Sequence, residues 1–242
     1  MGLFDFLKNK EEQPDNSKNQ QAVEFSVGDI IYTKTSGKLH LHKILAEDKD
    51  FECYHVLTYE PVDSLPASDD IDHLTVFVYH SPFAKTAFAG AALLTNRQVI
   101  ADDLIGYHEY LRQTQEPNYY LPIANGYYKA ALKLTDEGEH YDAIDSYSKA
   151  IDLFPQFFEA IDNRAFCKMD LGLWSDAIED FKLSLKQNPN SLLAEFSIGE
   201  CYFKMGDYEN AKQQFEIAHN IDPNDQIPRQ FLDKVNDILG NQ

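Results

Sequence analysis

The sequence reads GEHYDAIDSYSKAIDLFP at residues 138–155, and similar stretches follow: GLWSDAIEDFKLSLKQNP at residues 172–189 and GDYENAKQQFEIAHNIDP at residues 206–223. Successive stretches begin 34 residues apart. Six columns keep this spacing: Gly138, Gly172 and Gly206; Ala143, Ala177 and Ala211; Tyr147, Phe181 and Phe215; Ala150, Ser184 and Ala218; Pro155, Pro189 and Pro223; and, upstream, Ala131, Ala165 and Gly199. Such agreement over three copies indicates an internal structural repeat.

Each column of the repeat has a physical reason. Glycine supplies the left-handed backbone conformation that closes a helix, and proline cannot continue one. Small residues let two helices approach closely, while the aromatic residue fills the space beside them. Acidic or amide residues (Asp142, Asp176 and Asn210) open each second helix, where the dipole favours negative charge. The repeat therefore predicts three helical hairpins.

This pattern resembles the tetratricopeptide repeat family over about half the chain, residues 122–240. The family's W-x2-L-G-x2-Y segment falls on Tyr127, Ala130, Ala131 and Leu134 in the first copy, and on Ile198, Gly199 and Tyr202 in the third. The third copy has Glu195 where a large aromatic residue is usual, and the second departs at Arg164 and Lys168. All three copies keep the A-x3-F…P segment. The resemblance implies a superhelical all-α array.

A further helix is expected after the third repeat. The segment Gln226–Leu239 places four apolar residues at helical spacing: Ile227, Phe231, Val235 and Ile238. In the family, a capping helix often covers the apolar face of the last repeat. We therefore predict three repeats plus a C-terminal capping helix over residues 122–242.

The resemblance also implies where a ligand binds, because the first helix of each repeat lines the concave face of the array. Projection onto that face gives Asn125, Tyr128, Lys129 and Leu132, then Asp162, Asn163, Phe166 and Met169, then Leu193, Phe196, Glu200 and Phe203. From these we predict eight peptide-binding residues: Tyr128, Lys129, Leu132, Asn163, Phe166, Met169, Phe196 and Phe203. The alternative is that several of the aromatic residues pack between repeats.

One known ligand of the family can be tested residue by residue. Repeats that hold the acidic C-termini of heat-shock chaperones use Lys and Asn in the first repeat, Asn in the second, and Lys and Arg in the third. Here only Asn163 matches; Lys129 and Lys133 are offset by one position, and Leu193 and Ser197 occupy the third-repeat places. The sequence thus argues against a chaperone clamp and favours a segment with apolar anchors and some basic residues.

Residues 24–120 show no such repeat, and their pattern of apolar and turn residues is typical of a β-rich α+β domain. Four short runs rich in Val, Ile, Tyr and Phe are separated by turn signals and predict strands: Asp29–Lys34, Lys38–Leu45, Phe51–Tyr59 and Leu74–His80. Alternation around Leu39 and Leu41 predicts one apolar and one polar face. A helix is expected at Ala101–Gln113, and residues 84–100 fit either helix or loop. We predict a small antiparallel sheet or partly open barrel, from no recognised family.

The N-terminal residues 1–23 are predicted to be a disordered tail or linker, since residues 8–22 are almost free of apolar groups. Before that linker lies a short apolar patch (Leu3, Phe4, Phe6 and Leu7), which is either a docking segment or a frayed tail. So few residues with little positive charge cannot hold a membrane unaided. We expect no stable membrane anchoring.

Charge and cysteine usage narrow the class of protein. Lysine and arginine number 21 against 40 aspartates and glutamates, a net charge of −19. A field of this sign repels phosphate backbones, so no nucleic-acid partner is predicted. The three cysteines (Cys53, Cys167 and Cys201) are few and far apart in the sequence. This pattern is typical of reduced, buried thiols, so we predict a cytoplasmic protein.

No catalytic motif is present, and we predict no catalytic residue, metal or cofactor. His40 and His42 share one strand face and would suit a metal pair, but no spacing indicates further ligands, so we expect solvated side chains. Asp69, Asp70 and Asp72 lack the EF-hand pattern and are expected in a solvated loop. Asp102 and Asp103 open a helix, where carboxylates stabilise the N-terminus.

The predicted function is that of a non-catalytic scaffold or adaptor that binds a protein segment in the repeat groove. Two rivals stay open. One is an acidic inhibitory or immunity-type protein that masks a basic partner. The other is an enzyme whose site lies in residues 24–120, marked by a ligand or metal among His40, His42, His55 and His80, with repeats that recruit substrate.

Overall fold

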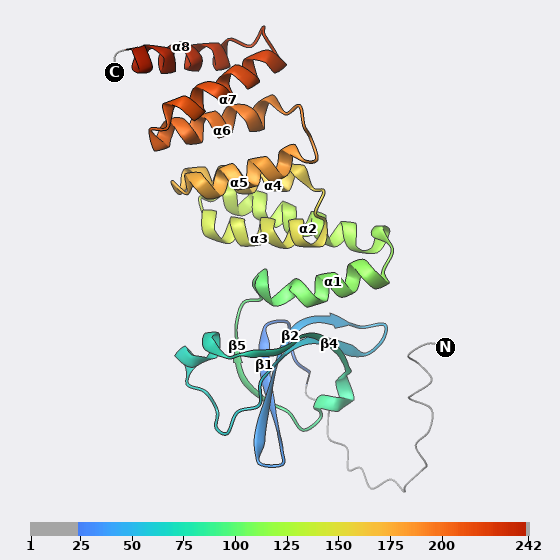
Figure 1. The fold of residues 1–242 in the computed structure, drawn as a ribbon. Coiled ribbons are helices and arrows are strands. Elements are labelled where there is room, and N and C mark those ends of the chain that lie inside the picture. The colour runs from blue at the N-terminus through green and yellow to red at the C-terminus, as the bar shows by residue number, and fades with distance from the viewer. Residues whose placement is uncertain (1–23, 241–242) are drawn as a thin grey trace, which may run out of the picture.

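The structure is a computed structural model that describes residues 24–240. The predicted tail at residues 1–23 and its apolar patch (Leu3, Phe4, Phe6 and Leu7) lie outside the described residues. Figure 1 shows an antiparallel sheet at one end and a column of stacked helices that leads away from it. The predicted α+β architecture is therefore confirmed.

Five strands form the sheet: β1 (Asp29–Thr35), β2 (Lys38–Asp48), β3 (Cys53–Tyr59), β4 (Val76–Ala84) and β5 (Ala92–Asn96). Their order is β4-β3-β2-β1-β5, and every neighbouring pair is antiparallel. The four predicted strands are present. The fifth, β5, lies in segment 84–100, for which the sequence predicted helix or loop, so that prediction is wrong for this part. The same segment also holds the 3-10 turn η3 (Lys85–Phe88).

Both faces of the sheet are covered, so the prediction of one apolar and one polar face is wrong. One face carries Leu41, Leu57 and other apolar residues in a cluster that continues into the helices. The other face carries Ile44 and Tyr54, which pack with Phe25 and Phe88. Residues before β1 and in η3 therefore cover the side of β2 that the sequence pattern assigned to solvent.

The helical half begins with the turn η4 (Asp102–Leu104) and α1 (Ile105–Thr114), which confirms the helix expected at Ala101–Gln113. The three predicted hairpins follow as α2 (Pro117–Asp136) with α3 (His140–Leu153), α4 (Phe158–Asp170) with α5 (Trp174–Leu185), and α6 (Leu192–Met205) with α7 (Tyr208–Ile221). The capping helix is α8 (Gln226–Gly240). Helix α2 starts at Pro117, earlier than residue 122, because proline is well tolerated in a first turn.

The glycine and small-residue columns play the roles that the repeat predicts. Gly138, Gly172 and Gly206 have φ angles of +80°, +73° and +79° and lie in the turns between paired helices. At Gly199 a Cβ atom would lie 2.6 Å from Cε1 of Phe215. Only glycine therefore lets α6 and α7 approach this closely.

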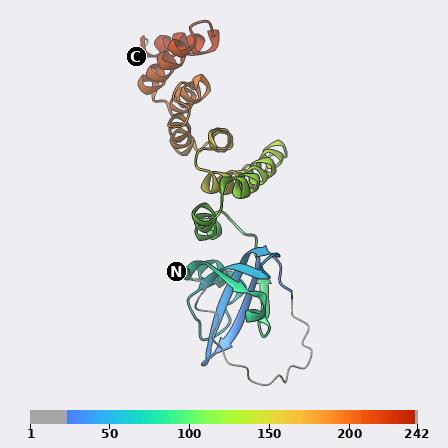
Figure 2. The same ribbon diagram turned by 90° about the vertical axis from the view of Figure 1, so that its right-hand side faces the viewer.

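The sheet and the first repeat share one hydrophobic core. The cluster on the α1 side of the sheet includes Leu57, Leu111, Ala124 and Leu153, which come from β3, α1, α2 and α3. Figure 2 shows α1 between the sheet and the remaining helices. Helix α1 thus closes the N-terminal end of the repeat column, as α8 closes its C-terminal end.

Candidate functional site: the first helices of the repeats

The predicted ligand-binding residues all lie on α2, α4 and α6, the first helices of the three hairpins. We call the side of these helices that carries them the inner face. It consists of Asn125, Tyr128, Lys129, Leu132, Asp162, Asn163, Phe166, Met169, Leu193, Phe196, Glu200 and Phe203. Their surroundings decide which side chains a ligand can reach.

Tyr128 and Asn163 connect the first two repeats across the inner face. The Asn163 side-chain amide donates to the Tyr128 hydroxyl at 3.2 Å and to the backbone oxygen of Glu159 at 2.9 Å. The Tyr128 ring lies 4.7 Å from that of Phe157. Burial raises the pKa of Tyr128, so its hydroxyl stays protonated. This pair offers a ready-made polar contact in the middle of the face.

The central apolar residues of the inner face are partly buried in the repeat core. Phe166 meets Phe181 edge to face at 5.2 Å, and Met169 packs in the same cluster. Leu132 packs in the cluster of the first repeat. These side chains present only part of their surface to a ligand, while Lys129 is exposed.

At the C-terminal end of the inner face, helix α8 contacts two predicted anchors. The Phe231 ring lies 5.1 Å from that of Phe196 and 6.3 Å from that of Phe203. The Lys234 ammonium lies 4.7 Å from the centre of the Phe203 ring, a cation–π contact. Helix α8 therefore covers part of the Phe196 and Phe203 rings, whereas Leu193 is half exposed at 50%.

Desolvated carboxyl groups give the inner face its charge character. Asp162 is only 8% exposed, and its Oδ1 has no hydrogen-bond partner among the described residues. Burial raises the pKa of Asp162 and of Glu200, although the Ser184 hydroxyl and Lys204 respectively oppose the shift. Burial also raises the pKa of Glu195. Carboxyl groups in such surroundings are stabilised by an incoming cation.

Two charged residues that depart from the family pattern have a structural partner that the sequence analysis missed. Arg164 donates to both oxygens of Asp180, at 2.8 and 2.7 Å, and to the Ser148 hydroxyl at 2.9 Å. Lys168 reaches the same carboxylate at 2.7 Å. The spacing of Arg164 and Lys168, one helical turn apart, was the available signal that they share a partner.

The histidines of the sheet half do not form one site. His42 is buried against Phe83 and Phe88 and hydrogen-bonds Thr58 at 2.9 Å, so the expectation of a solvated side chain is wrong there. His55 and His80 contact one another at 2.8 Å beside Tyr107 of α1. The second sheet face is covered by aromatic residues, which explains the burial of His42.

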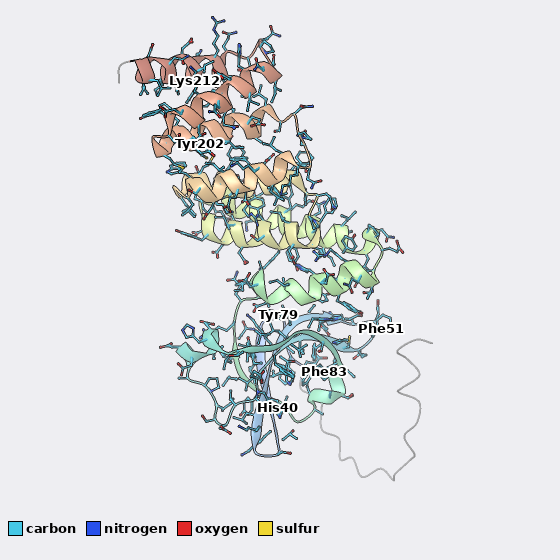
Figure 3. The ribbon with its side chains drawn as sticks, in the orientation of Figure 1. His40, Phe51, Tyr79, Phe83, Tyr202 and Lys212 are labelled. Atoms are coloured by element: carbon cyan, nitrogen blue, oxygen red, sulfur yellow. The ribbon has the colours of Figure 1, made fainter. Side chains whose placement is uncertain are left out.

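Figure 3 labels His40 and Phe83 in the sheet half, and Tyr202 and Lys212 on the third hairpin. His40 is partly exposed, and Tyr202 packs in the clusters of both the second and third repeats. Within residues 24–240 no group of three or more His, Cys, Asp or Glu side chains could hold a metal ion. Of the four histidines of the enzyme hypothesis, His55 and His80 are in contact, whereas His42 lies against Phe83 and Phe88.

The structure also places the acidic residues and the cysteines that the sequence analysis discussed. Asp103, expected only to stabilise a helix start, accepts from the buried Lys43 ammonium at 2.6 Å. Asp69, Asp70 and Asp72 are exposed, as expected, but they lie in the 3-10 helix η2 (Ser68–His73) and not in a loop. Cys167 and Cys201 are free and buried, as expected, whereas Cys53 is free but only partly buried, so the expectation of a buried thiol is wrong there. Burial raises the pKa of Cys201 to about 12, so this thiol is protonated and unreactive. No described helix is both long and apolar enough to cross a membrane.

Comparison with known proteins identifies a tetratricopeptide repeat in a segment of the helical half. A family model described as tetratricopeptide repeat matches residues 193–225, which include most of α6 and all of α7. Hsp70-Hsp90 organizing protein 2 of Arabidopsis thaliana is 27% identical over 125 residues, which cover 51% of this chain and 21% of that protein. Small glutamine-rich tetratricopeptide repeat-containing protein 2 of Mycosarcoma maydis is 30% identical over 90 residues, 37% of this chain and 26% of that protein.

Among solved structures, the first tetratricopeptide repeat domain of Spaghetti (RPAP3) bound to the HSP90 peptide SRMEEVD is 26% identical, with a TM-score of 0.46. The match covers 48% of this chain and 93% of that one. The chain thus spans only about a quarter or less of the length of the two curated relatives.

Proposed function

We propose that this chain, whose helical half carries tetratricopeptide repeats, is a non-catalytic adaptor that binds a segment of another protein on the inner face. The sheet half, which shares a core with α1 and the first repeat, would hold the N-terminal end of the repeat column in place. A cytoplasmic location is part of the same proposal, because the described cysteines are free thiols.

The observation that carries the proposal is the mixture of side chains on the inner face. Leu193 is half exposed although it is large and apolar, and Tyr128 and Phe166 present part of their rings. Beside them lie the desolvated carboxyl groups of Asp162 and Glu200. The apolar anchors of a ligand segment would bury Leu193, Tyr128 and Phe166 further. A lysine or arginine next to those anchors would compensate the charge of the carboxyl groups.

The names of the relatives make an acidic chaperone tail the main alternative ligand. The inner face argues against it, because Leu193 and Ser197 stand where that ligand would need cations, and Ser197 is 1% exposed. Residues 121–242 carry 11 basic and 21 acidic residues, a net charge of −10 that adds long-range repulsion.

The proposal is tested by selecting ligands for the full chain from a random peptide library, with the peptide SRMEEVD as a competitor. We expect enrichment of peptides that combine aromatic or aliphatic residues with lysine or arginine. Enrichment of acidic sequences, or displacement of the selected peptides by SRMEEVD, would contradict the proposal and favour an acidic ligand.

Two matched substitutions locate the binding surface. Leu193→Glu places a charge on the inner face, and we expect at least about tenfold weaker binding of the selected peptides. Ile217→Glu is the control, because Ile217 is 41% exposed on α7, a second helix of a hairpin. Equal effects of the two substitutions would place the ligand elsewhere.

A further inference from the structure

The sheet half contains a pocket that the proposed adaptor function does not use. The pocket has a volume of 330 Å³ and lies between the sheet and the segments at residues 71–76 and 97–103. Five aliphatic residues contribute to its wall: Ile30, Ile71, Leu74, Val76 and Ile100. Its size and its mainly apolar wall are typical of a site for a small molecule.

A fixed ion pair forms one polar part of the wall. The Lys43 ammonium donates to Asp103 at 2.6 Å and to the backbone oxygen of Gln98 at 2.8 Å. The Lys43 side chain is 7% exposed, so its position is determined by these two bonds. An ammonium has three donors, which leaves one for a ligand, and Lys43 neutralises the charge of Asp103.

Arg97 provides a donor that lacks an acceptor. Its Nη2 donates to the backbone oxygen and the hydroxyl of Ser68, both at 2.9 Å, which fixes the guanidinium plane. Its Nε is buried and has no hydrogen-bond partner among residues 24–240. The carboxylate oxygen of Asp72 lies 4.0 Å from Nε, too far for a hydrogen bond, and the Asp72 side chain is 72% exposed. A buried donor without an acceptor is costly, and a ligand that supplies the acceptor relieves that cost.

Tyr59 adds a third donor to the same pocket. The residue is 7% exposed, and burial raises the pKa of its hydroxyl, as do the carboxylates of Asp103 and Asp72. The hydroxyl therefore stays protonated. Lys43, Tyr59 and Arg97 thus line one pocket with donors, and the rest of its wall consists of the five aliphatic residues together with Gln98, Asp72 and Asp103.

We propose that this pocket binds a small molecule that carries one carboxylate on a short branched aliphatic body. The Arg97 Nε and the Tyr59 hydroxyl donate to the carboxylate, together with the remaining donor of Lys43. The aliphatic body packs against Ile71 and Leu74. The exposed side chain of Asp72 is free to turn toward solvent as the carboxylate approaches.

The test is an NMR titration of the full chain with 4-methylpentanoate, and with 4-methylpentanamide as the uncharged probe of the same shape. We expect saturable shifts of the Arg97 Nε–H signal and of the Ile71 and Leu74 methyl signals with the carboxylate, and at least about tenfold weaker binding of the amide. Equal binding of both probes, or no saturable shift up to about 10 mM, would overturn the proposal.

Variants separate binding from folding. Arg97→Gln removes the guanidinium, with its Nε donor and its positive charge, and Leu74→Trp fills the pocket. Each is expected to weaken binding of 4-methylpentanoate by about tenfold or more. Arg229→Gln, on the exposed side of α8, is the control and should bind as the natural chain does. Unchanged binding by Leu74→Trp, in a variant whose melting temperature shows that it is folded, would also overturn the proposal.

Discussion

The Nδ1 atom of His108 lies 2.7 Å from Oδ2 of Asp152, and this contact joins α1 to the end of α3. His108 is completely buried, and Arg112 on the next turn of α1 donates to the backbone oxygen of Asp152. The surrounding core combines residues of the sheet with Leu111 and Leu153. The sheet half and the first repeat should therefore unfold together.

Removal of the Asp152 carboxylate tests this coupling. In Asp152→Ala the buried His108 loses its partner, so we expect the free energy of unfolding to fall by about 1–3 kcal/mol. Urea denaturation should show one shifted transition, whether it is followed by circular dichroism or by the fluorescence of Trp174. Asp233→Ala, at an exposed position of α8, should change stability by less than about 0.5 kcal/mol. A separate transition of the sheet half, shifted alone, would mean that the two halves are independent.

The ion cluster around Asp180 predicts non-additive substitutions. Arg164→Met leaves Asp180, whose side chain is 6% exposed, with Lys168 as its remaining cation, and we expect a loss of about 3 kcal/mol in unfolding free energy. Adding Asp180→Leu removes the buried charge itself. The double variant should therefore be less destabilised than the sum of the two single variants, which a double-mutant cycle measures. Additive losses would indicate that the Arg164–Asp180 pair contributes little.

Two helical glycines predict effects of opposite sign. Gly199→Ala forces a Cβ atom against Phe215, and we expect a loss of about 1–3 kcal/mol. At Gly126 in α2 a Cβ atom would meet nothing within 4 Å, so Gly126→Ala should stabilise the chain by about 0.5–1 kcal/mol. Thermal unfolding of the two variants and of the natural chain measures both changes in stability. Similar losses at both positions would contradict the packing described for α6 and α7.

The helical half was predictable because its spacing is local and repeated. A glycine that ends one helix and a proline that ends the next act through the backbone alone, so the columns at Gly138 and Pro155 place the hairpins directly. The sheet order and the covering of its second face depend on contacts between distant residues, such as Phe25 with Tyr54. No short-range pattern contains that information.

The same distinction applies to the candidate sites. Projection of the repeat onto a helix gave the inner-face residues, but it could not show that Phe231 of α8 packs on Phe196. The pocket beside Lys43 and Arg97 was missed for a similar reason, because these residues are 54 positions apart in the chain. Alternation in β2 even suggested that His42 faces solvent, since the covering aromatic residues come from later in the sequence.

Acid should destabilise the sheet half through its histidines. Burial lowers the pKa of His42 to about 4 and that of His80 to about 4, with His40 and His55 adding to the respective shifts. As the pH falls from about 6.5 toward 4, the unfolded chain takes up protons that the folded chain refuses, so stability is lost with decreasing pH. Each histidine then contributes up to about 1.4 kcal/mol per pH unit.

Melting temperatures recorded from pH 7 to pH 5 test this, because most carboxylates do not titrate in that range. The combined variant His42→Gln and His80→Gln should show a flatter pH dependence than the natural chain. A dependence as steep as that of the natural chain would assign the proton uptake to other groups, among which His55, whose pKa is also lowered by burial, would be the next to substitute.

The ionic strength of the medium distinguishes the adaptor from an acidic protein that masks a basic partner. Apolar anchors on the inner face predict that binding of the selected peptides weakens only modestly as salt is raised, because buried contacts are poorly screened. Binding governed by the net charge of −19 would instead weaken steeply. Titrations by fluorescence anisotropy at low and high salt provide the comparison.

The most direct test of the central claim is an NMR footprint of a selected peptide on the full, isotope-labelled chain. We expect the shifted backbone amides to belong to α2, α4 and α6, with the largest shifts near Tyr128, Asn163 and Leu193. Shifts confined to the second helices α3, α5 and α7, or to the sheet, would contradict this claim.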